Sequence, residues 1–332
     1  MRVAVVRNHL HTGVVNRFGH PCREGYDLDA VRRIVAALQE GGHETLLCEG
    51  DKGLFATLER FMPPDPQALP SGFVFNLASG IQGECRLSHV PSMLELAGVP
   101  YTGAGPLGNG LALDKAIAKM LMRDRGLPTP QFCVMRRGTE GTGDLRFPLV
   151  VKPRSESSSF GLQLALEPAQ LKQAVEAVTA QYGQDALVEE YVEGREVYVG
   201  LLGNEELETL PLVERDFGDR EMSLVTQEDK ASMALGAICP AQVDSKLATM
   251  LHDISVASFR ACECRDYARV DIRIDRSGQP FILEINSIPG LRSIYVQAAT
   301  AAGYSFSGLI NRILDVAHKR YFGVGAPSRK AR

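Results

Sequence analysis

Four polar residues in the segment 268–290 have a spacing that could hold a metal ion. Arg269 and Asp271 alternate with apolar residues, and after a short gap Glu284 and Asn286 do the same. Such alternation is typical of half-buried β-strands. The residues between the two runs, Asp-Arg-Ser-Gly-Gln at 275–279, have turn chemistry. The segment therefore predicts a β-hairpin with four polar heads close together.

Two registers of this hairpin are open. A four-residue loop at 276–279 would place Asp271 opposite Glu284 and Arg269 opposite Asn286, whereas a two-residue turn would pair Arg269 with Glu284. Both registers put all four side chains on one face. Opposed carboxylates repel by about 0.2–1 kcal/mol. A divalent cation bound between them would replace this repulsion with attraction. Two carboxylates and an amide oxygen suit Mg²⁺ or Mn²⁺; the alternative is a polar face in water.

The composition indicates an ordinary globular protein and excludes several classes. The chain has 332 residues, enough for two or three domains, with 45% hydrophobic and 23% charged residues. A formal net charge of −4 gives no reason to expect a nucleic-acid partner. No apolar run approaches the roughly 18 residues of a membrane helix. Seven cysteines without a CxxC pair fit a reducing compartment. We predict a cytoplasmic protein with neither nucleic-acid nor membrane partners.

Strands and helices alternate in the first hundred residues, which favours a parallel α/β unit. Strands are predicted at 3–6, 44–48 and 73–77, and helices at 28–40 and 88–97. Later strands are predicted at 147–152, 186–191 and 196–202, and later helices at 111–125, 168–181, 243–264 and 307–320. Residues 214–236 lack periodicity and are rich in charge, which predicts a mobile loop.

Three further segments could bind a ligand. Gly103 to Gly108 match GxGxxG, but that pattern normally closes the first strand of a domain, so an interdomain turn is favoured over a nicotinamide-dependent dehydrogenase. The loop 153–161 contains four serines and follows a strand ending in Lys152; its N–H groups and hydroxyls could hold phosphate, or it could be a plain turn. His9 and His11 lack further ligands and fit ordinary loop residues better than a metal site.

Several motifs together resemble a known family. FPLVVKPRSESSSFG at 147–161, LVEEYVEGRE at 187–196, RVDIRI at 269–274 and ILEINSIPG at 282–290 follow one another in order. ELAGVPYTGAG at 95–105 and LALDK at 111–115 precede them. Over most of residues 70–320 the chain resembles the ATP-grasp carboxylate–amine ligases, in particular the D-alanine–D-alanine ligases.

The resemblance implies a mixed α/β fold with three-domain ATP-grasp architecture. An N-terminal Rossmann-like parallel α/β domain would span 1–112, a central subdomain 113–193 and a C-terminal subdomain with the metal site 194–322, followed by a flexible tail at 323–332. ATP would lie between two antiparallel sheets. A homodimer is implied as well.

The resemblance also assigns roles to individual residues. For ATP it implies Lys115 and Lys152 on the phosphates, Ser158 or Ser159 in the phosphate loop, Glu189, Tyr191 and Val192 at the adenine hinge, and Glu196 on the ribose. For two Mg²⁺ (or Mn²⁺) ions it implies Asp271, Glu284 and Asn286. The chemistry would pass through an acyl phosphate, with Arg269 and the Gly290 N–H stabilising an oxyanion and Lys230 reaching the phosphates from a lid.

The chain departs from the family in its substrate region. Glu24 is the nearest candidate for the glutamate that binds the first substrate's ammonium, and Ser79 replaces an expected histidine. Ala231 replaces the tyrosine after the lid lysine, and Tyr295 and its neighbours replace a serine segment for the second substrate. We therefore hypothesise a ligase of amino-acid or peptide-like substrates other than D-alanine. The alternatives are a D-alanine–D-alanine ligase of peptidoglycan synthesis and a non-catalytic ATP-binding protein.

Overall fold

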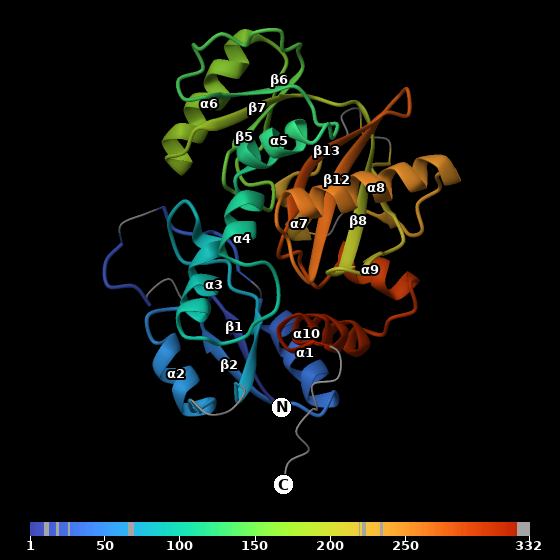
Figure 1. The fold of residues 1–332 in the computed structure, drawn as a ribbon. Helices are drawn as coiled ribbons and strands as arrows, with labels where there is room; N and C mark the ends of the chain where they lie inside the picture. The colour runs from blue at the N-terminus through green and yellow to red at the C-terminus, as the bar shows by residue number, and fades with distance from the viewer. Residues whose placement is uncertain are drawn as a thin grey trace.

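The computed structural model describes residues 1–9, 13–17, 20–25, 27–65, 70–218, 220, 224–232 and 235–323, apart from the side chains of Lys230 and Ala231. Within these ranges the strands form one parallel sheet and two antiparallel sheets (Figure 1). The predicted α/β fold class, with a parallel N-terminal sheet followed by antiparallel sheets, is confirmed.

The N-terminal sheet is parallel and has helices on both faces. Its strand order is β2-β1-β3. The strands are β1 (Arg2–Arg7), β2 (Glu44–Glu49) and β3 (Gly72–Asn76), and the helices are α1 (Leu28–Glu40), α2 (Leu54–Phe61) and α3 (Arg86–Leu96). α1 begins where expected because the Asp27 carboxylate caps it, accepting a hydrogen bond from the Ala30 N–H at 2.8 Å.

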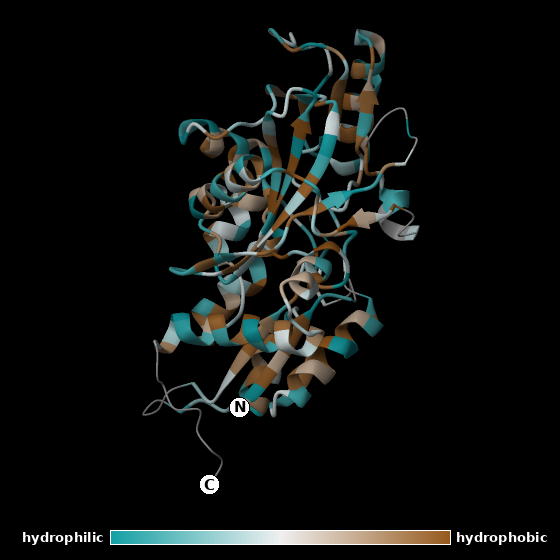
Figure 2. Ribbon diagram, turned by 90° about the vertical axis from the view of Figure 1, so that its right-hand side faces the viewer, coloured by the Kyte–Doolittle hydropathy of each residue, from teal (hydrophilic) through white to brown (hydrophobic). Residues whose placement is uncertain are grey.

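One face of this sheet is completed by a distant helix, α10 (Phe306–Phe322). α10 lies beside α1 (Figure 1), and the Asn311 amide donates to the carbonyl oxygen of Ala37 at 2.8 Å. Apolar side chains of β1, β3, α1 and α10 share one buried cluster, while α2 and α3 cover the opposite face. In Figure 2 apolar residues follow the strands and the inner sides of these helices.

The central four-stranded sheet is antiparallel, with the order β4-β7-β5-β6. Its elements are β4 (Phe132–Met135), β5 (Leu149–Pro153), β6 (Gln163–Ala165), β7 (Ala186–Glu190) and α6 (Pro168–Tyr182). Apolar residues of α6 pack on β5, β6 and β7.

The single helix predicted at 111–125 was wrong. The chain forms α4 (Pro106–Leu113) and α5 (Lys115–Asp124), separated by Asp114 with an extended ψ of 95°. The Asp114 carboxylate accepts hydrogen bonds from the N–H groups of Ala116 and Ile117, so it starts a new helix. It also pairs with Arg154 at 2.7 Å.

The third sheet is antiparallel and runs β11-β10-β8-β12-β13, with β9 also paired to β8. Its strands are β8 (Gly194–Gly203), β9 (Leu207–Thr209), β10 (Val213–Arg215), β11 (Ala237–Ile238), β12 (Tyr267–Asp275) and β13 (Pro280–Asn286). α5 and α8 (Ser245–Ala261) pack on one face, and α9 (Ile294–Ala301) packs on the other, toward the N-terminal sheet.

Part of the segment 214–236, predicted to lack regular structure, is helical. α7 spans Gln227–Ser232. A reciprocal cap starts it, because the Thr226 hydroxyl donates to Asp229 at 2.9 Å while the Asp229 N–H donates back at 3.2 Å. Apolar periodicity could not reveal a helix that depends on such local polar contacts.

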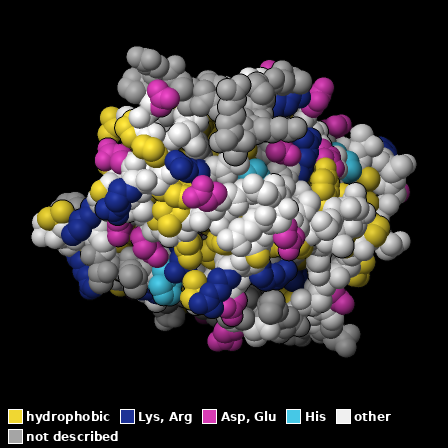
Figure 3. All heavy atoms as spheres, turned by 90° about the horizontal axis from the view of Figure 1, so that it is seen from below, with side chains coloured by type: hydrophobic (Ala, Val, Ile, Leu, Met, Phe, Trp, Pro, Cys, Tyr) yellow, Lys and Arg dark blue, Asp and Glu magenta, His cyan; other side chains and the backbone are white. Residues whose placement is uncertain are grey.

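The surface carries both acidic and basic side chains, as the small net charge of the sequence suggests. On the face in Figure 3 acidic, basic and apolar side chains are interspersed. Among the described helices, none combines the length and apolar character that a transmembrane span requires.

Candidate active site

The polar hairpin has the register expected for a four-residue loop. Asp271 lies opposite Glu284 and Arg269 opposite Asn286. The Asp275 carboxylate fixes the turn by accepting from the N–H groups of Ser277 and Gln279. The pairing then shifts by one residue, so that Ile272 lies opposite Ile282. The predicted hairpin is confirmed, and its polar residues lie in the first of the two registers left open by the sequence.

Two adjoining cavities flank the hairpin. The larger has a volume of about 810 Å³ and lies between the third sheet, α9 and the serine-rich loop. The smaller lies between the second and third sheets. They share four lining residues, namely Lys115, Ser157, Val225 and Glu284. A ligand in one cavity would therefore lie next to a ligand in the other.

The predicted site residues divide between these cavities. The smaller is lined by Lys152, Ser159, Glu189, Tyr191, Val192, Glu196 and Asp271. The larger is lined by Glu24, Ser79, Ser158, Arg269, Asn286 and Gly290, and Lys115 and Glu284 reach both. Residues from six separate segments of the sequence thus meet at one place.

A buried carboxylate links two lysines beside the smaller cavity. Glu189 pairs with Lys152, and its other oxygen lies 2.8 Å from the Lys119 ammonium. Burial lowers the pKa of Lys119 to about 8, although Glu189 opposes this. Burial also disfavours the charged form of Lys152, but the carboxylates around it outweigh burial and raise its pKa. Lys119 was not predicted; its i,i+4 spacing from Lys115 was the available signal.

A second buried cation organises the predicted hinge and ribose residues. The Arg273 guanidinium donates to the Val192 carbonyl at 3.0 Å and lies 3.3 Å from the Glu196 carboxylate. Glu196 also accepts a hydrogen bond from the Tyr198 hydroxyl at 2.5 Å. Arg273 was not predicted, although its alternation with Arg269 and Asp271 indicates the same face.

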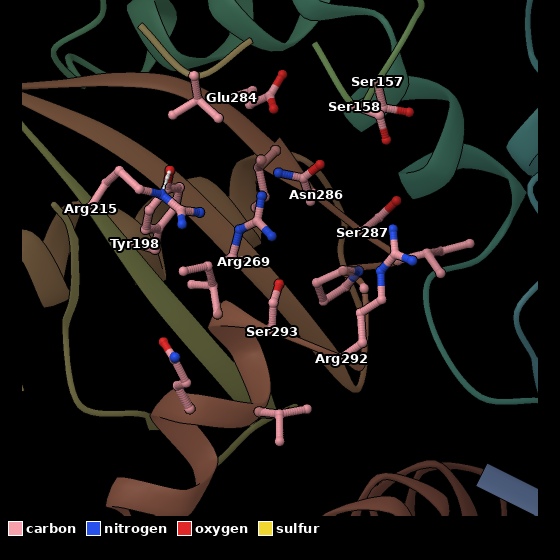
Figure 4. Close-up of a pocket in the computed structure, with 18 of the residues that line it drawn as sticks. Ser157, Ser158, Tyr198, Arg215, Arg269, Glu284, Asn286, Ser287, Arg292 and Ser293 are labelled. Carbon is pink, nitrogen blue, oxygen red and sulfur yellow. Dashed lines mark hydrogen bonds between the residues drawn. The ribbon is translucent and has the colours of Figure 1, made fainter. Parts of the chain in front are cut away.

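Charges are paired on the hairpin face, from which Figure 4 shows Arg269, Glu284 and Asn286. Arg269 makes two hydrogen bonds to Asp271, at 2.6 and 2.7 Å, and Lys115 lies 3.5 Å from Glu284. Burial opposes the charge on Arg269, but Asp271 outweighs burial and raises its pKa. The Asn286 side-chain nitrogen is buried and has no hydrogen-bond partner within the described residues.

The serine-rich loop is tied to the first loop of the chain through Glu24. The Ser158 hydroxyl donates to Glu24 at 2.7 Å, and the Ser157 hydroxyl donates to its other oxygen. Ser158 and Ser159 have φ values of 56° and 57°, in the left-handed region. Consecutive residues of this kind turn the backbone sharply at the wall between the cavities.

A fully buried arginine that the sequence analysis missed lies beneath Glu24. The Arg86 guanidinium lies 3.2 Å from Glu24 and 3.4 Å from Glu156, and it donates to the Ser155 carbonyl at 2.6 Å. Only 2% of Arg86 is exposed. No local pattern marks this residue, because its partners come from distant segments.

Comparison with known proteins identifies the family. Residues 121–315 match the family model for the D-ala D-ala ligase C-terminus. A D-alanine–D-alanine ligase from Pelotomaculum thermopropionicum is 34% identical over 244 residues, which cover 69% of this chain and 75% of that protein. The chain belongs to the D-alanine–D-alanine ligase family. It is an ATP-dependent ligase of this type, as the sequence motifs predicted.

Two further relatives extend the match over nearly the whole length. "Uncharacterized protein y4sG" from Sinorhizobium fredii is 65% identical over 336 residues, covering 98% of this chain and 99% of that protein. The crystal structure of a D-alanine–D-alanine ligase from Bacillus anthracis complexed with ATP has a TM-score of 0.75 at 22% identity, covering 96% of this chain and 98% of that one. The ligase fold therefore includes the N-terminal sheet.

The structure does not bring Tyr295 to the larger cavity. Its side chain is buried, its hydroxyl donates to the Leu201 carbonyl at 2.8 Å, and its ring packs edge-on against Tyr267. Tyr295 thus fixes α9 to β8, because an aromatic ring at this position faces the apolar cluster. Its neighbours Arg292 and Ser293 line the cavity instead.

The remaining predicted residues do not line either cavity or lie outside the described residues. The side chains of Lys230 and Ala231 lie outside the described residues, as does His11, and His9 is exposed. In the GxGxxG segment, the Gly103 N–H donates to Asp266, and a side chain on Gly108 would collide with the Glu263 carbonyl. This segment is a packed turn followed by the start of a helix. This packing and the family match together exclude the dinucleotide-binding interpretation.

Proposed function

We propose that the protein joins the carboxylate of one amino-acid or peptide-like substrate to the amine of another, at the expense of ATP. The observation that carries this proposal is the junction of the two cavities at Lys115 and Glu284. A nucleotide in the smaller cavity would present its terminal phosphate to a carboxylate in the larger one. That proximity is what a phosphoryl transfer to a carboxylate needs.

ATP occupies the smaller cavity in this proposal. Lys115, Lys152, Ser158 and Ser159 hold the phosphates, Glu196 holds the ribose, and the hinge at Glu189, Tyr191 and Val192 receives adenine. The contacts of Glu189 with Lys152 and of Arg273 with Glu196 support it, because they fix the phosphate and ribose groups in place. Preorganised charges are more effective than mobile ones.

Two Mg²⁺ or Mn²⁺ ions complete the nucleotide site, held by Asp271, Glu284 and Asn286. The donor set fits, since it offers two carboxylates and an amide on one hairpin face. The partnerless nitrogen of Asn286 supports the assignment, because rotating the amide by 180° would present its oxygen there. Bound ions would neutralise phosphate charge.

The reaction then has two steps. A carboxylate oxygen bonds to the γ-phosphorus as the bond to the β-phosphate oxygen breaks, which releases ADP and leaves an acyl phosphate. The neutral amine nitrogen of the second substrate attacks the acyl carbon and loses a proton. The carbon–oxygen bond to phosphate breaks, and an amide and phosphate result. Arg269 and the Gly290 N–H stabilise the tetrahedral oxyanion, and the family resemblance assigns Lys230 to the phosphates.

Substrate recognition belongs to the larger cavity. Glu24 binds the ammonium of the first substrate, and Ser79 lines the same cavity. By the family resemblance, Ala231 stands where a larger tyrosine is expected and leaves room for the substrate. The cavity volume of about 810 Å³ supports substrates larger than D-alanine. The names of the curated relatives favour a second candidate, D-alanine itself.

Three broader assignments complete the proposal. The chain is organised as an N-terminal domain at 1–112, a central subdomain at 113–193 and a C-terminal subdomain at 194–322. It acts on small molecules in the cytoplasm, as a homodimer. Light scattering coupled to size-exclusion chromatography would test the dimer, and a monomer mass would reject it.

The decisive experiment is Mg²⁺-dependent ADP release from ATP with D- and L-amino acids, offered singly and in pairs. We expect turnover with at least one pair, and its loss in Glu284→Gln. Glu59→Gln, at an exposed position of α2, is the matched control. Turnover with D-alanine alone would support the second candidate. Absence of ADP release with every pair would overturn the ligase proposal.

A further inference from the structure

The wall of the larger cavity formed by β8 and β10 carries an arginine that the reaction described above does not use. Val213 of β10 lies opposite Tyr198 of β8, so Arg215, two residues on, faces the same side. The Arg215 guanidinium lies over the Tyr198 ring, 5.4 Å from its centroid. Figure 4 shows Arg215 and Arg269 both directed into the cavity.

Among the described residues, every other charged side chain that lines this cavity has a partner of opposite sign. The pairs are Glu24 with Arg86, Lys115 with Glu284, Asp229 with Arg220, Arg269 with Asp271, and Arg292 with Asp27. Arg215 donates only to neutral oxygens, the Leu235 carbonyl at 3.2 Å and the Tyr198 hydroxyl at 3.4 Å. Within the described part of the chain, no carboxylate pairs with it.

The neighbouring acidic groups cannot neutralise Arg215. Glu214 lies on the opposite face of β10 and makes two 2.6 Å hydrogen bonds to Arg195. The Tyr198 hydroxyl donates its proton to Glu196 at 2.5 Å, so it offers Arg215 only a neutral oxygen. In the described part of the chain, the Arg215 guanidinium therefore faces the cavity without an acidic partner.

A guanidinium in such a position selects a carboxylate or a phosphate, because its planar donors match two oxygens at once. Arg215 lines the larger cavity and is absent from the lining of the smaller one. A substrate carboxylate therefore fits better than a phosphate of ATP. Arg269 already faces the reacting carbonyl in the proposed reaction, so Arg215 is available for an additional acidic group.

We propose that Arg215 is a specificity-determining residue that binds a second carboxylate, and that one substrate of this enzyme is a dicarboxylic amino acid or a peptide ending in one. This inference rests on the proposed ligase function and specifies its substrate class. Loss of the Arg215 charge would weaken binding of that substrate and leave ATP binding intact.

The test compares each dicarboxylic amino acid with its neutral amide. ADP release is measured with aspartate against asparagine and glutamate against glutamine, in both enantiomers and with each partner amino acid. We expect the wild type to favour the dicarboxylic member by at least about tenfold in kcat/KM, the size expected of a charge-assisted contact. Arg215→Met should abolish this preference through KM, with kcat and the KM of ATP unchanged. Arg215→Lys should restore part of it.

Two controls keep the test decisive. Arg60→Met, at an exposed position of α2, should behave as wild type, and thermal melting should show that each Arg215 variant is folded. A raised KM for ATP in Arg215→Met, or equal use of acid and amide by the wild type, would overturn the proposal.

Direct binding separates this inference from the ligase proposal. Calorimetry with the same amino acids, in the presence of Mg²⁺ and a non-hydrolysable ATP analogue, requires no turnover. Arg215-dependent binding of a dicarboxylic amino acid without any ADP release would support the role of Arg215 and reject the ligase proposal. ADP release from neutral substrates that is insensitive to Arg215→Met would support the ligase proposal and reject the role of Arg215.

Discussion

The Glu24 carboxylate accepts a hydrogen bond from the Ser158 hydroxyl at 2.7 Å, across 134 residues of sequence. This contact joins the first loop of the chain to the loop at the wall between the cavities. If Glu24 holds a substrate ammonium, as proposed, the same carboxylate also positions the serines that approach the phosphates. Binding of the first substrate and of ATP would then depend on each other.

Glu24→Gln tests this double role. The amide keeps the size of the side chain but loses its charge, so we expect KM for the first substrate to rise at least about tenfold, as for loss of a charged hydrogen bond. KM for ATP should rise less. Steady-state ADP release measures both, with Glu59→Gln as the control. An unchanged KM for every substrate would show that Glu24 serves only to hold the loop.

Arg86→Met should destabilise the protein. The substitution leaves Glu24 and Glu156 without their buried counter-charge, and breaking a buried pair in this way typically costs about 3–5 kcal/mol. Urea unfolding measures the loss, and Arg60→Met should remain within about 0.5 kcal/mol of wild type. Adding Glu24→Gln to Arg86→Met should recover part of the loss, since one unpaired carboxylate is removed. If the changes in unfolding free energy of the two single variants simply add in the double variant, Arg86 and Glu24 do not stabilise the protein as an ion pair.

Glu189→Gln should change how stability depends on pH. Burial raises the pKa of Glu189, but Lys119 and Lys152 outweigh burial and lower it below the ordinary 4.5. The unfolded chain thus binds more protons near that pH, so the stabilisation is present above about pH 4.5 and is lost as pH falls through the folded pKa. Urea midpoints between pH 7 and pH 3 should fall less steeply in the variant, from a lower starting value. Parallel curves would contradict the assignment.

Asp114→Ala should weaken the break between α4 and α5. The lost cap costs about 1 kcal/mol, and Arg154 loses its ion pair. Because Lys115 directly follows the cap, we also expect a raised KM for ATP. Asp114→Asn keeps a capping oxygen and should retain most of the stability. Equal melting temperatures for the Ala and Asn variants would reject the capping role.

Features set by neighbouring residues could be predicted from the sequence. The hairpin and its polar face follow from the alternation of residues, whereas the choice between its two registers does not, because a one-residue shift in pairing between Asp271 and Ile272 sets it. α1 could be delimited because Asp27 and Gly41 mark its ends. Lys115 and Lys152 could be named only because their motifs resemble a family.

Features that depend on distant contacts could not be predicted. Arg86 and Arg215 have no local signature, and their importance arises from charges brought together by folding. Tyr295 was predicted to contact a substrate because of its position in the sequence, yet its ring packs against Tyr267 in the core. The cap at Asp114 was hidden within a strongly helical stretch, where propensity alone favours continuity.

The position of α10 beside α1 has a consequence for how the protein is made. Val3, Val5 and Phe73 of the N-terminal sheet share their apolar cluster with Leu309 and Ile313 of α10. During synthesis only α1 covers this side of the first sheet until α10 leaves the ribosome. The nascent chain thus exposes part of its apolar core through most of translation, a condition that favours aggregation before the fold is complete.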